Sequence, residues 1–259
     1  KNDVPVKDDP NSFIIKEVKR DILYNFLRDM EFNRLLSQAI SVYGEGSKTK
    51  KISKSKESNI SKINIKLYKS ILDEEDLEKL IDNLNKKSII SVDTETTSLN
   101  PMEADLVGIS FSCAPNEAYY IPIGHEKIKC LDKELVLKKI KSLLEDDSIK
   151  KVGQNIKYDL IVLKNNGITI SPIEDTMLLS YVLDAGNNRH NMNTLSEIHL
   201  AHKTISYKEL VGTGKKQLKF SDINLKEATE YAAEDADVTL RLYELLSERV
   251  NQEGLIKIY

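Results

Sequence analysis

Cysteine is scarce in this chain, and long apolar runs and net positive charge are absent. Cys113 and Cys130 have no C-x-x-C spacing, which argues against a disulfide framework and favours a reduced, cytoplasmic setting. No run of residues is long and apolar enough to cross a bilayer, so no membrane partner is expected. No secretory signal peptide is recognisable. Because the chain begins with Lys1 rather than Met, we expect a piece of a longer protein.

The charge balance restricts how this chain could bind nucleic acid. Its 38 basic and 41 acidic residues give a formal net charge of −3, whereas nucleic-acid-binding domains are often strongly basic. A binder with this balance must gather its lysines and arginines on one face. The length of 259 residues is enough to bury a proper core, and predicts one large domain or one domain with an appendage. No internal repeat is visible.

Composition divides the chain into three parts. Apolar residues at three- and four-residue spacing predict helix over 17–40, within a helical segment that we assign to 1–44. Residues 45–66 are rich in lysine and serine and poor in large apolar residues, which is typical of a linker. Residues 67–259 are predicted to form one α/β domain, with a mixed sheet flanked by helices. We predict strands over 88–93, 105–113, 117–123 and 150–153, and helices over 73–85, 132–145, 156–166, 175–184, 194–200 and 225–250.

The first acidic motif follows a predicted strand. The apolar run that ends at Val92 leads directly into Asp93-x-Glu95. In a strand, residues i and i+2 point to the same face, and ligand sites gather at the carboxyl ends of strands in α/β sheets. Other D-x-E pairs occur in this chain within polar, helix-like stretches, where a solvated surface is the ordinary interpretation. At Asp93 and Glu95 the ordinary alternative is a pair of residues that cap a turn.

Two further motifs lie downstream, Asn155-x-x-x-Asp159 and Tyr231-x-x-x-Asp235. Each has the i, i+4 spacing that places both side chains on one face of a helix. Either motif is weak alone, and Tyr231 could simply pack on the core. Together with the first motif they supply four carboxylates from three distant segments. Such a set can hold two divalent metal ions beside a phosphodiester, so the sequence predicts a nuclease.

In this order the three motifs resemble the exonuclease motifs of the DEDD superfamily, in the subgroup that has tyrosine in the third motif. The strings SVDTETTSL, KVGQNIKYD and YAAEDADVTL resemble the 3′–5′ proofreading exonuclease domain of bacterial DNA polymerase I over roughly 67–250. The resemblance implies a ribonuclease H-like fold. FLRDMEFNRLL is similar to the last helices of that polymerase's 5′-nuclease domain, and GLIKIY is similar to the entry to its polymerase domain. No polymerase segment is present, so polymerisation is not expected of this chain.

The resemblance also implies roles for the motif residues. Asp93, Glu95 and Asp235 are assigned to one metal ion, and Asp93 with water-mediated help from Asp159 to the other. Mg²⁺ or Mn²⁺ suits carboxylate oxygens, and Zn²⁺ is a further candidate. Tyr231 is expected to orient the attacking water, because a phenol with a pKa near 10 is a poor base at neutral pH. The expected substrate contacts are Leu99 and Tyr207 at the terminal base, Asn155 at the backbone, and Arg189 in a basic stretch over 189–219.

These expectations give one function and two alternatives. The chain is predicted to shorten single-stranded or frayed DNA from the 3′ end as the proofreading part of a DNA polymerase I. We expect a monomer in the bacterial cytoplasm, associated with the nucleoid, whose full-length chain carries a polymerase domain. An RNA-processing exonuclease of the same superfamily shares the metal chemistry. A catalytically silent spacer or DNA-guiding module is the alternative from another class.

Overall fold

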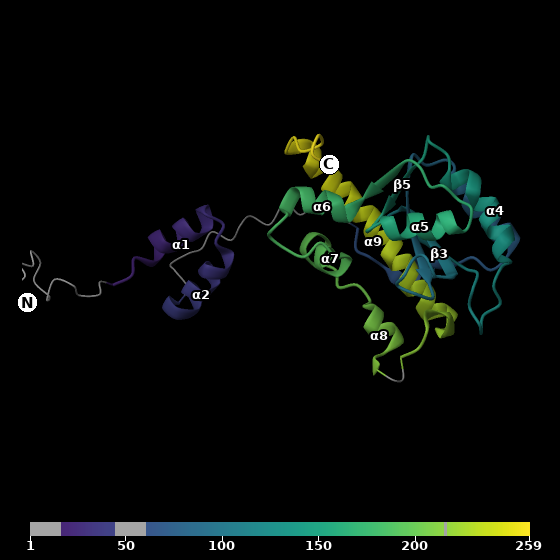
Figure 1. Cartoon of the computed structure of the whole chain (residues 1–259), viewed down its shortest axis with the longest axis horizontal. Helices are drawn as coiled ribbons and strands as arrows, with labels where there is room; N and C mark the ends of the chain where they lie inside the picture. The colour runs from purple at the N-terminus through teal and green to yellow at the C-terminus, as the bar shows by residue number, and fades with distance from the viewer. Residues whose placement is uncertain (1–16, 45–60, 215–216) are drawn as a thin grey trace, which may run out of the picture. The chain divides into compact units, whose positions relative to one another are not determined.

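The computed structural model describes residues 17–44, 61–214 and 217–259 (Figure 1). Most of the predicted linker over 45–66 lies outside these residues. The chain forms two compact units, Lys1–Asn59 and Ile60–Tyr259. The predicted domain boundaries at 44 and 66 stay predictions. Among the residues that the structure describes, no helix is long and apolar enough to span a bilayer.

The first unit contains a pair of helices, α1 (Arg20–Asp29) and α2 (Asn33–Tyr43). The sequence predicted continuous helix over 17–40, and this was wrong at the turn between them. Glu31 has a φ of 56°, a left-handed conformation that cannot continue a right-handed helix. The buried Tyr24 joins the two helices, since its hydroxyl donates to the carbonyl of Gly44 at 2.6 Å.

The second unit is built on one mixed sheet, as predicted. Within the described residues its strands are in the order β1-β4-β3-β2-β5-β6. Strands β2, β3 and β4 pair antiparallel, while β5 and β6 run parallel to β2 and β1 runs parallel to β4. The sequence pattern did not predict the two shortest strands, β1 and β6. The bounds are β1 Lys69–Ser70, β2 Ile89–Thr96, β3 Leu106–Ala114, β4 Glu117–Pro122, β5 Lys150–Gly153 and β6 Ile173–Asp175.

Helices cover both faces of this sheet. One face packs against α3 (Glu74–Leu84), α4 (Lys133–Leu144) and α5 (Lys157–Asn165) through a core that includes Ile90 and Val92 of β2. The long helix α9 (Leu225–Gln252) contacts β2, β3, β4 and β5 (Figure 1), and α6 (Thr176–Asp184) and α7 (Met192–Leu200) pack on α9. The short helix α8 (Tyr207–Val211) and the 3₁₀ turns η2 (Ile65–Leu67) and η4 (Phe220–Asp222) were not predicted.

Small residues allow α9 to lie close to the sheet. Ala228, Ala232 and Ala236 of α9 are fully buried, and so is Ser91 of β2, whose hydroxyl donates to the carbonyl of Ala236 at 2.7 Å. The helix begins where the side chain of Asn224 accepts from the Glu227 backbone amide, as an N-cap residue does. Odd-numbered residues of β2 face α9, because Ile90 and Val92 belong to the opposite core.

Candidate active site

Strand β2 delivers the first two carboxylates of the site. It continues to Thr96, beyond the predicted end at residue 93, because Asp93 pairs with Ser110 and Glu95 with Gly108 of β3. Side chains alternate along a strand, so Asp93 and Glu95 point to the same face of the sheet as Ser91. The Ser91 side chain contacts α9, so this is the face that α9 covers. Glu95 is buried and Asp93 is half-buried.

Helix α9 delivers the third carboxylate and the tyrosine. Tyr231 and Asp235 both lie within α9, so the predicted i, i+4 pair shares one helical face. Asp93, Glu95 and Asp235 each offer an oxygen, and these oxygens all lie within 4.8 Å of one another. Three converging carboxylate oxygens are a donor set that suits a hard divalent cation such as Mg²⁺ or Mn²⁺.

Asp159 stands beside this group and is not part of it. It is buried in the first turn of α5, and one of its oxygens accepts from both the backbone amide of Thr94 at 3.0 Å and the Thr94 hydroxyl at 2.5 Å. Asp159 is nevertheless near enough to raise the pKa of Asp93 and Glu95 through charge repulsion. Three of the four predicted carboxylates therefore converge directly, and the fourth borders them.

Burial disfavours the charged form of all four carboxylates. Removal from water, followed by repulsion among the carboxylates, raises the pKa of Asp93 and Glu95 well above the usual range. Burial raises the pKa of Asp159 to about 7, and burial together with the charge of Glu234 raises the pKa of Asp235 to about 8. Bound cations would reverse this effect, because they favour ionised ligands. The site is thus arranged to hold protons or cations.

The hydroxyl of Tyr231 stays protonated at neutral pH. Burial, followed by the negative charges of Asp235 and Glu95, raises the pKa of Tyr231 above its usual value. Its ring lies between two others, with centroids 6.2 Å from Tyr207 and 5.9 Å from Phe220. A phenol held in this way can donate or accept a hydrogen bond but is not a base at neutral pH.

The predicted substrate contacts differ in their surroundings. The side chain of Leu99 is 95% exposed and that of Tyr207 is 40% exposed, so both are open to a partner. Arg189 is exposed as well. Asn155 was wrongly placed on a helix: it precedes α5 and has a φ of 60°. Its backbone amide donates to Asp175 at 3.0 Å, and its exposed side chain is not aligned with Asp159 by a helical turn.

Part of the predicted basic stretch is otherwise engaged. Lys203 forms an ion pair with Glu209 at 3.4 Å, while Lys215 and Lys216 lie outside the described residues. The binding roles of Leu99, Asn155, Arg189 and Tyr207 stay predictions.

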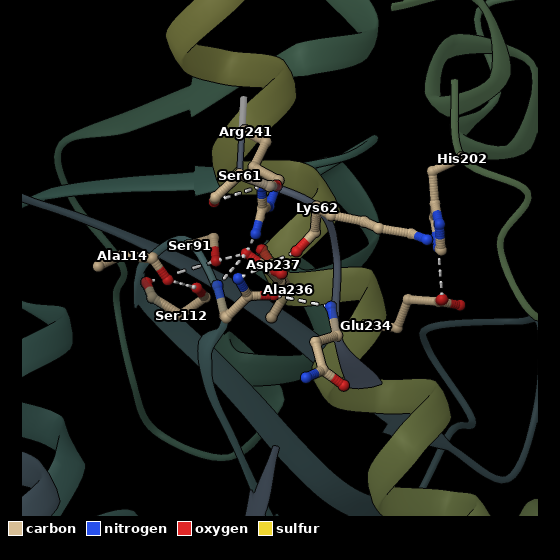
Figure 2. Close-up of polar contacts among 12 residues, drawn as sticks. Ser61, Lys62, Ser91, Ser112, Ala114, His202, Glu234, Ala236, Asp237 and Arg241 are labelled. Atoms are coloured by element: carbon tan, nitrogen blue, oxygen red, sulfur yellow. Dashed lines mark hydrogen bonds and ion pairs between the residues drawn. The ribbon is translucent and has the colours of Figure 1, made fainter. Parts of the chain in front are cut away.

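Several residues that support the site were missed by the sequence analysis. Thr94 binds Asp159, as described above, and the Tyr158 hydroxyl contacts the hydroxyl of Thr96 and the carbonyl of Ser98. Glu234, the neighbour of Asp235, accepts from His202 Nε2 at 2.7 Å (Figure 2) and from the amide of Ile205 at 2.6 Å. No motif marks these residues, because their partners are distant in the sequence.

A second buried polar cluster lies further along α9. Asp237 accepts from Arg241 Nε at 2.9 Å, and Arg241 donates to the carbonyl of Ser61 at 2.5 Å (Figure 2). The Tyr68 hydroxyl also donates to Asp237, at 2.8 Å. The backbone amide of Asn116 also donates to Asp237, at 3.1 Å. This cluster fixes the beginning of the second unit to α9.

Comparison with known proteins decides the family. A family model described as 3′–5′ exonuclease matches residues 68–251. The chain belongs to this 3′–5′ exonuclease family. Among curated relatives of the exonuclease, DNA polymerase I of Rhizobium leguminosarum is 41% identical over 215 residues, which is 74% of this chain and 21% of that protein. DNA polymerase I of Pseudomonas aeruginosa is 35% identical over 256 residues, 96% of this chain and 27% of that protein. The exonuclease chain thus spans about a quarter of these relatives' length.

Solved structures support the fold of this exonuclease. The catalytic core of RRP6 from Trypanosoma brucei has a TM-score of 0.57 at 18% identity, over 76% of this chain and 49% of that one. Escherichia coli RNase D has a TM-score of 0.55 at 20% identity, over 72% of this chain and 46% of that one. Brucella melitensis NrnC with bound Mg²⁺ has a TM-score of 0.53 at 23% identity, over 72% of this chain and 82% of that one. The predicted ribonuclease H-like mixed sheet flanked by helices is therefore confirmed.

Proposed function

We propose that this exonuclease removes nucleoside 5′-monophosphates from the 3′ ends of single-stranded or frayed DNA, as the proofreading part of a DNA polymerase I. The observation that carries the proposal is the convergence of oxygens from Asp93, Glu95 and Asp235 within 4.8 Å of one another. The relatives with DNA polymerase I names, at 35–41% identity, favour DNA as the substrate.

The donor set fits two divalent ions, Mg²⁺ or Mn²⁺, with Zn²⁺ as a further candidate. Asp93, Glu95 and Asp235 would hold one ion, and Asp93 with Asp159 acting through water would hold the other. The hydrogen bonds from Thr94 occupy one oxygen of Asp159, so a water-mediated role suits that residue. When bound, such ions supply an activated water and stabilise the leaving 3′ oxygen. The NrnC structure with bound Mg²⁺ supports the choice of metal.

The side chains around the ions would orient the substrate and the water. Tyr231 keeps its proton, so its hydroxyl would orient the attacking water by a hydrogen bond. Leu99 and Tyr207, both exposed, would contact the terminal base, since aromatic and apolar surfaces are common sites for unpaired bases. Asn155 and Arg189 would contact the backbone, where positive charge and amide donors suit phosphate oxygens. A frayed end would be preferred, because a mismatch has already reduced the cost of unpairing.

The setting of the proposed activity follows from the relatives. We place the chain in the bacterial cytoplasm near the nucleoid, as a monomer whose full-length form includes a polymerase domain. DNA polymerase I relatives several times longer than this chain support that assignment.

The test is hydrolysis of a 5′-labelled single-stranded DNA with Mg²⁺ or with EDTA, followed by product sizing. We expect stepwise 3′ shortening only with the metal, and none with Asp235→Ala. Asp82→Ala is the matched control, because Asp82 is exposed on α3, away from the carboxylate group. Full activity of Asp235→Ala would refute the metal assignment.

The same assay separates the two alternatives. An RNA-processing exonuclease would shorten an RNA of the same sequence faster than the DNA. A catalytically silent spacer would show no shortening, and calorimetry would detect little binding of Mn²⁺. We expect Mn²⁺ binding that Asp235→Ala abolishes and Asp82→Ala leaves intact.

A further inference from the structure

Glu234 is a buried carboxylate that the proposed mechanism does not use. It is 1% exposed and directly precedes Asp235 on α9. One of its oxygens accepts from His202 Nε2 at 2.7 Å (Figure 2), and the other accepts from the backbone amide of Ile205 at 2.6 Å. Both partners lie between α7 and α8. A single side chain of α9 therefore holds this connecting segment at two points.

The held segment leads directly into the helix that carries Tyr207. Ser206 begins α8 with a capping box: its side chain accepts from the amide of Glu209 at 3.3 Å, and the carboxylate of Glu209 accepts from the Ser206 amide at 3.0 Å. Reciprocal bonds of this kind fix the entry of the chain into a helix. With Ile205 fixed by Glu234 and Ser206 fixed by Glu209, the backbone next to Tyr207 has little freedom.

Tyr207 returns to the same face of α9. Its ring centroid lies 6.2 Å from that of Tyr231, in an edge-to-face arrangement. Tyr231 and Glu234 are three residues apart on α9, a spacing that places them on neighbouring positions of one helical face. The path from Glu234 through Ile205 and Tyr207 to Tyr231 therefore begins and ends on one rigid helix.

The charge of Glu234 is unfavourable for its neighbours. It adds a buried negative charge one residue from Asp235, where three carboxylates already converge. A neutral side chain at position 234 would not repel these three carboxylates. The stabilisation that a carboxylate gives at this position must therefore come from its two hydrogen bonds. Hydrogen bonds to an ionised acceptor are stronger than those between neutral groups.

We propose that Glu234 is a positioning residue that sets Tyr207 against Tyr231 where the 3′-terminal nucleotide binds. This inference rests on the proposed function. Glu234 touches neither the substrate nor the metal ions; it acts through the segment 202–205. Its loss should therefore weaken substrate binding through this segment, whereas its effect on metal binding should come only from the removal of its charge beside Asp235.

The experiment is a double-mutant cycle between Glu234→Leu and Tyr207→Ala in the complete chain, with Glu234→Gln as the conservative variant. Leucine removes both acceptors, whereas glutamine keeps an acceptor for the Ile205 amide. We expect Glu234→Leu to raise the KM for a single-stranded DNA about fivefold to tenfold. Glu234→Gln should recover much of this loss, and Glu234→Leu should change KM less than about twofold when Tyr207 is already alanine. The Kd for Mn²⁺ should be the same in Glu234→Leu and Glu234→Gln, because both remove the same charge beside Asp235, and it should keep the wild-type value in Tyr207→Ala.

Hydrogen exchange supplies a readout that does not depend on activity. We expect the amides of residues 203–207 to exchange faster in Glu234→Leu and in His202→Ala, which breaks one contact without altering α9. His202→Ala also serves as the test variant if Glu234→Leu does not fold.

Equal effects of Glu234→Leu on KM with and without Tyr207, or unchanged exchange over 203–207, would overturn the inference. A wild-type chain that binds Mn²⁺ but shortens no DNA would instead overturn the proposed function. The exchange data would still report whether Glu234 holds His202 and Ile205 in place.

Discussion

Thr94 and Asp159 are joined by two hydrogen bonds to one carboxylate oxygen, from the Thr94 amide at 3.0 Å and from its hydroxyl at 2.5 Å. Thr94 lies between Asp93 and Glu95 in β2, while Asp159 belongs to α5, which packs on the face of the sheet opposite α9. The residue between the first two acids therefore fixes the position of a third. Only the other oxygen of Asp159 is left for water or a cation.

Thr94→Val removes the hydroxyl and keeps the shape of the side chain and the backbone amide. We expect activity or metal affinity to fall about 10- to 100-fold, as is usual when a residue that orients a metal ligand is lost. Stability should fall by about 1–2 kcal/mol, because a buried charged acceptor loses a donor. Urea unfolding and Mn²⁺ titration measure the two effects. Thr169→Val, at an exposed position, should change neither; equal effects of both substitutions would contradict the prediction.

The metal-free protein should become less stable as the pH rises. The pKa of Asp159 is raised to about 7 and that of Asp235 to about 8, whereas in an unfolded chain both are about 4. The folded state therefore holds protons that the unfolded chain releases. This stabilisation is complete below about pH 4 and is lost as the pH rises to about 8. Thermal unfolding in EDTA measures the fall, and Mg²⁺ should reduce it, because cations replace the protons.

Asp235→Asn isolates the contribution of that carboxylate. The variant should show a shallower loss of Tm between about pH 5 and 9 than wild type, since it lacks one of the raised pKa values. Burial lowers the pKa of His125 and His199, so these groups favour folding as the pH rises and act in the opposite direction. Identical profiles of Tm against pH for wild type and Asp235→Asn in EDTA would contradict the raised pKa of Asp235.

The ion pair between Asp237 and Arg241 should be the costliest polar contact to break. Both side chains are almost fully buried, at 0% and 2% exposure. Asp237→Ala leaves the buried guanidinium without its carboxylate partner, and we expect the free energy of unfolding to fall by about 3–5 kcal/mol in urea unfolding. Glu253→Ala breaks the exposed pair with Arg249 and should cost about 1 kcal/mol or less. Comparable losses of stability in Asp237→Ala and Glu253→Ala would show that burial does not determine the cost of breaking an ion pair.

Gly108 should not tolerate a side chain. It pairs with Glu95 in the sheet, and an added Cβ would lie 2.1 Å from the hydroxyl oxygen of Tyr120. Tyr120 is fully buried and is held by a 2.8 Å hydrogen bond to His125, so it cannot move aside cheaply. Gly108→Ala should cost about 1–3 kcal/mol or more in thermal unfolding. Gly186→Ala, which meets nothing within 4 Å, is the control and should be nearly neutral.

Sequence periodicity predicted the elements that make repeated contacts. Helices α3, α4 and α9 and strands β2, β3 and β4 have several turns or pleats, so their patterns are long enough to detect. Strand β1 has two residues and β6 has three, too few for any pattern. The break at Glu31 and the left-handed Asn155 are single-residue backbone choices, which periodicity cannot indicate.

The sequence predicted the carboxylates of the site but not the residues that hold the surrounding structure in place. Asp93, Glu95 and Asp235 follow from motif spacing and converge. The hydrogen bonds of Asp159 to Thr94 and of Glu234 to His202 join residues 65 and 32 positions apart, and neither pair forms a motif. Within the run Glu234-Asp235-Ala236-Asp237, the motif spacing selected Asp235 and gave no role to Glu234 or Asp237.

Because of that run, the contacts of α9 depend on the rotation of the helix about its axis as well as on its composition. Successive residues of a helix are turned by about 100°, so Glu234, Asp235 and Asp237 each face a different partner: the segment before α8, the carboxylates of β2, and Arg241 with Tyr68. One residue inserted or deleted upstream of Glu234 would misdirect all three at once, although the composition of the helix would barely change. The rotation of α9 about its axis therefore affects the proposed metal site, the proposed positioning of the substrate and the anchoring of Ser61 together.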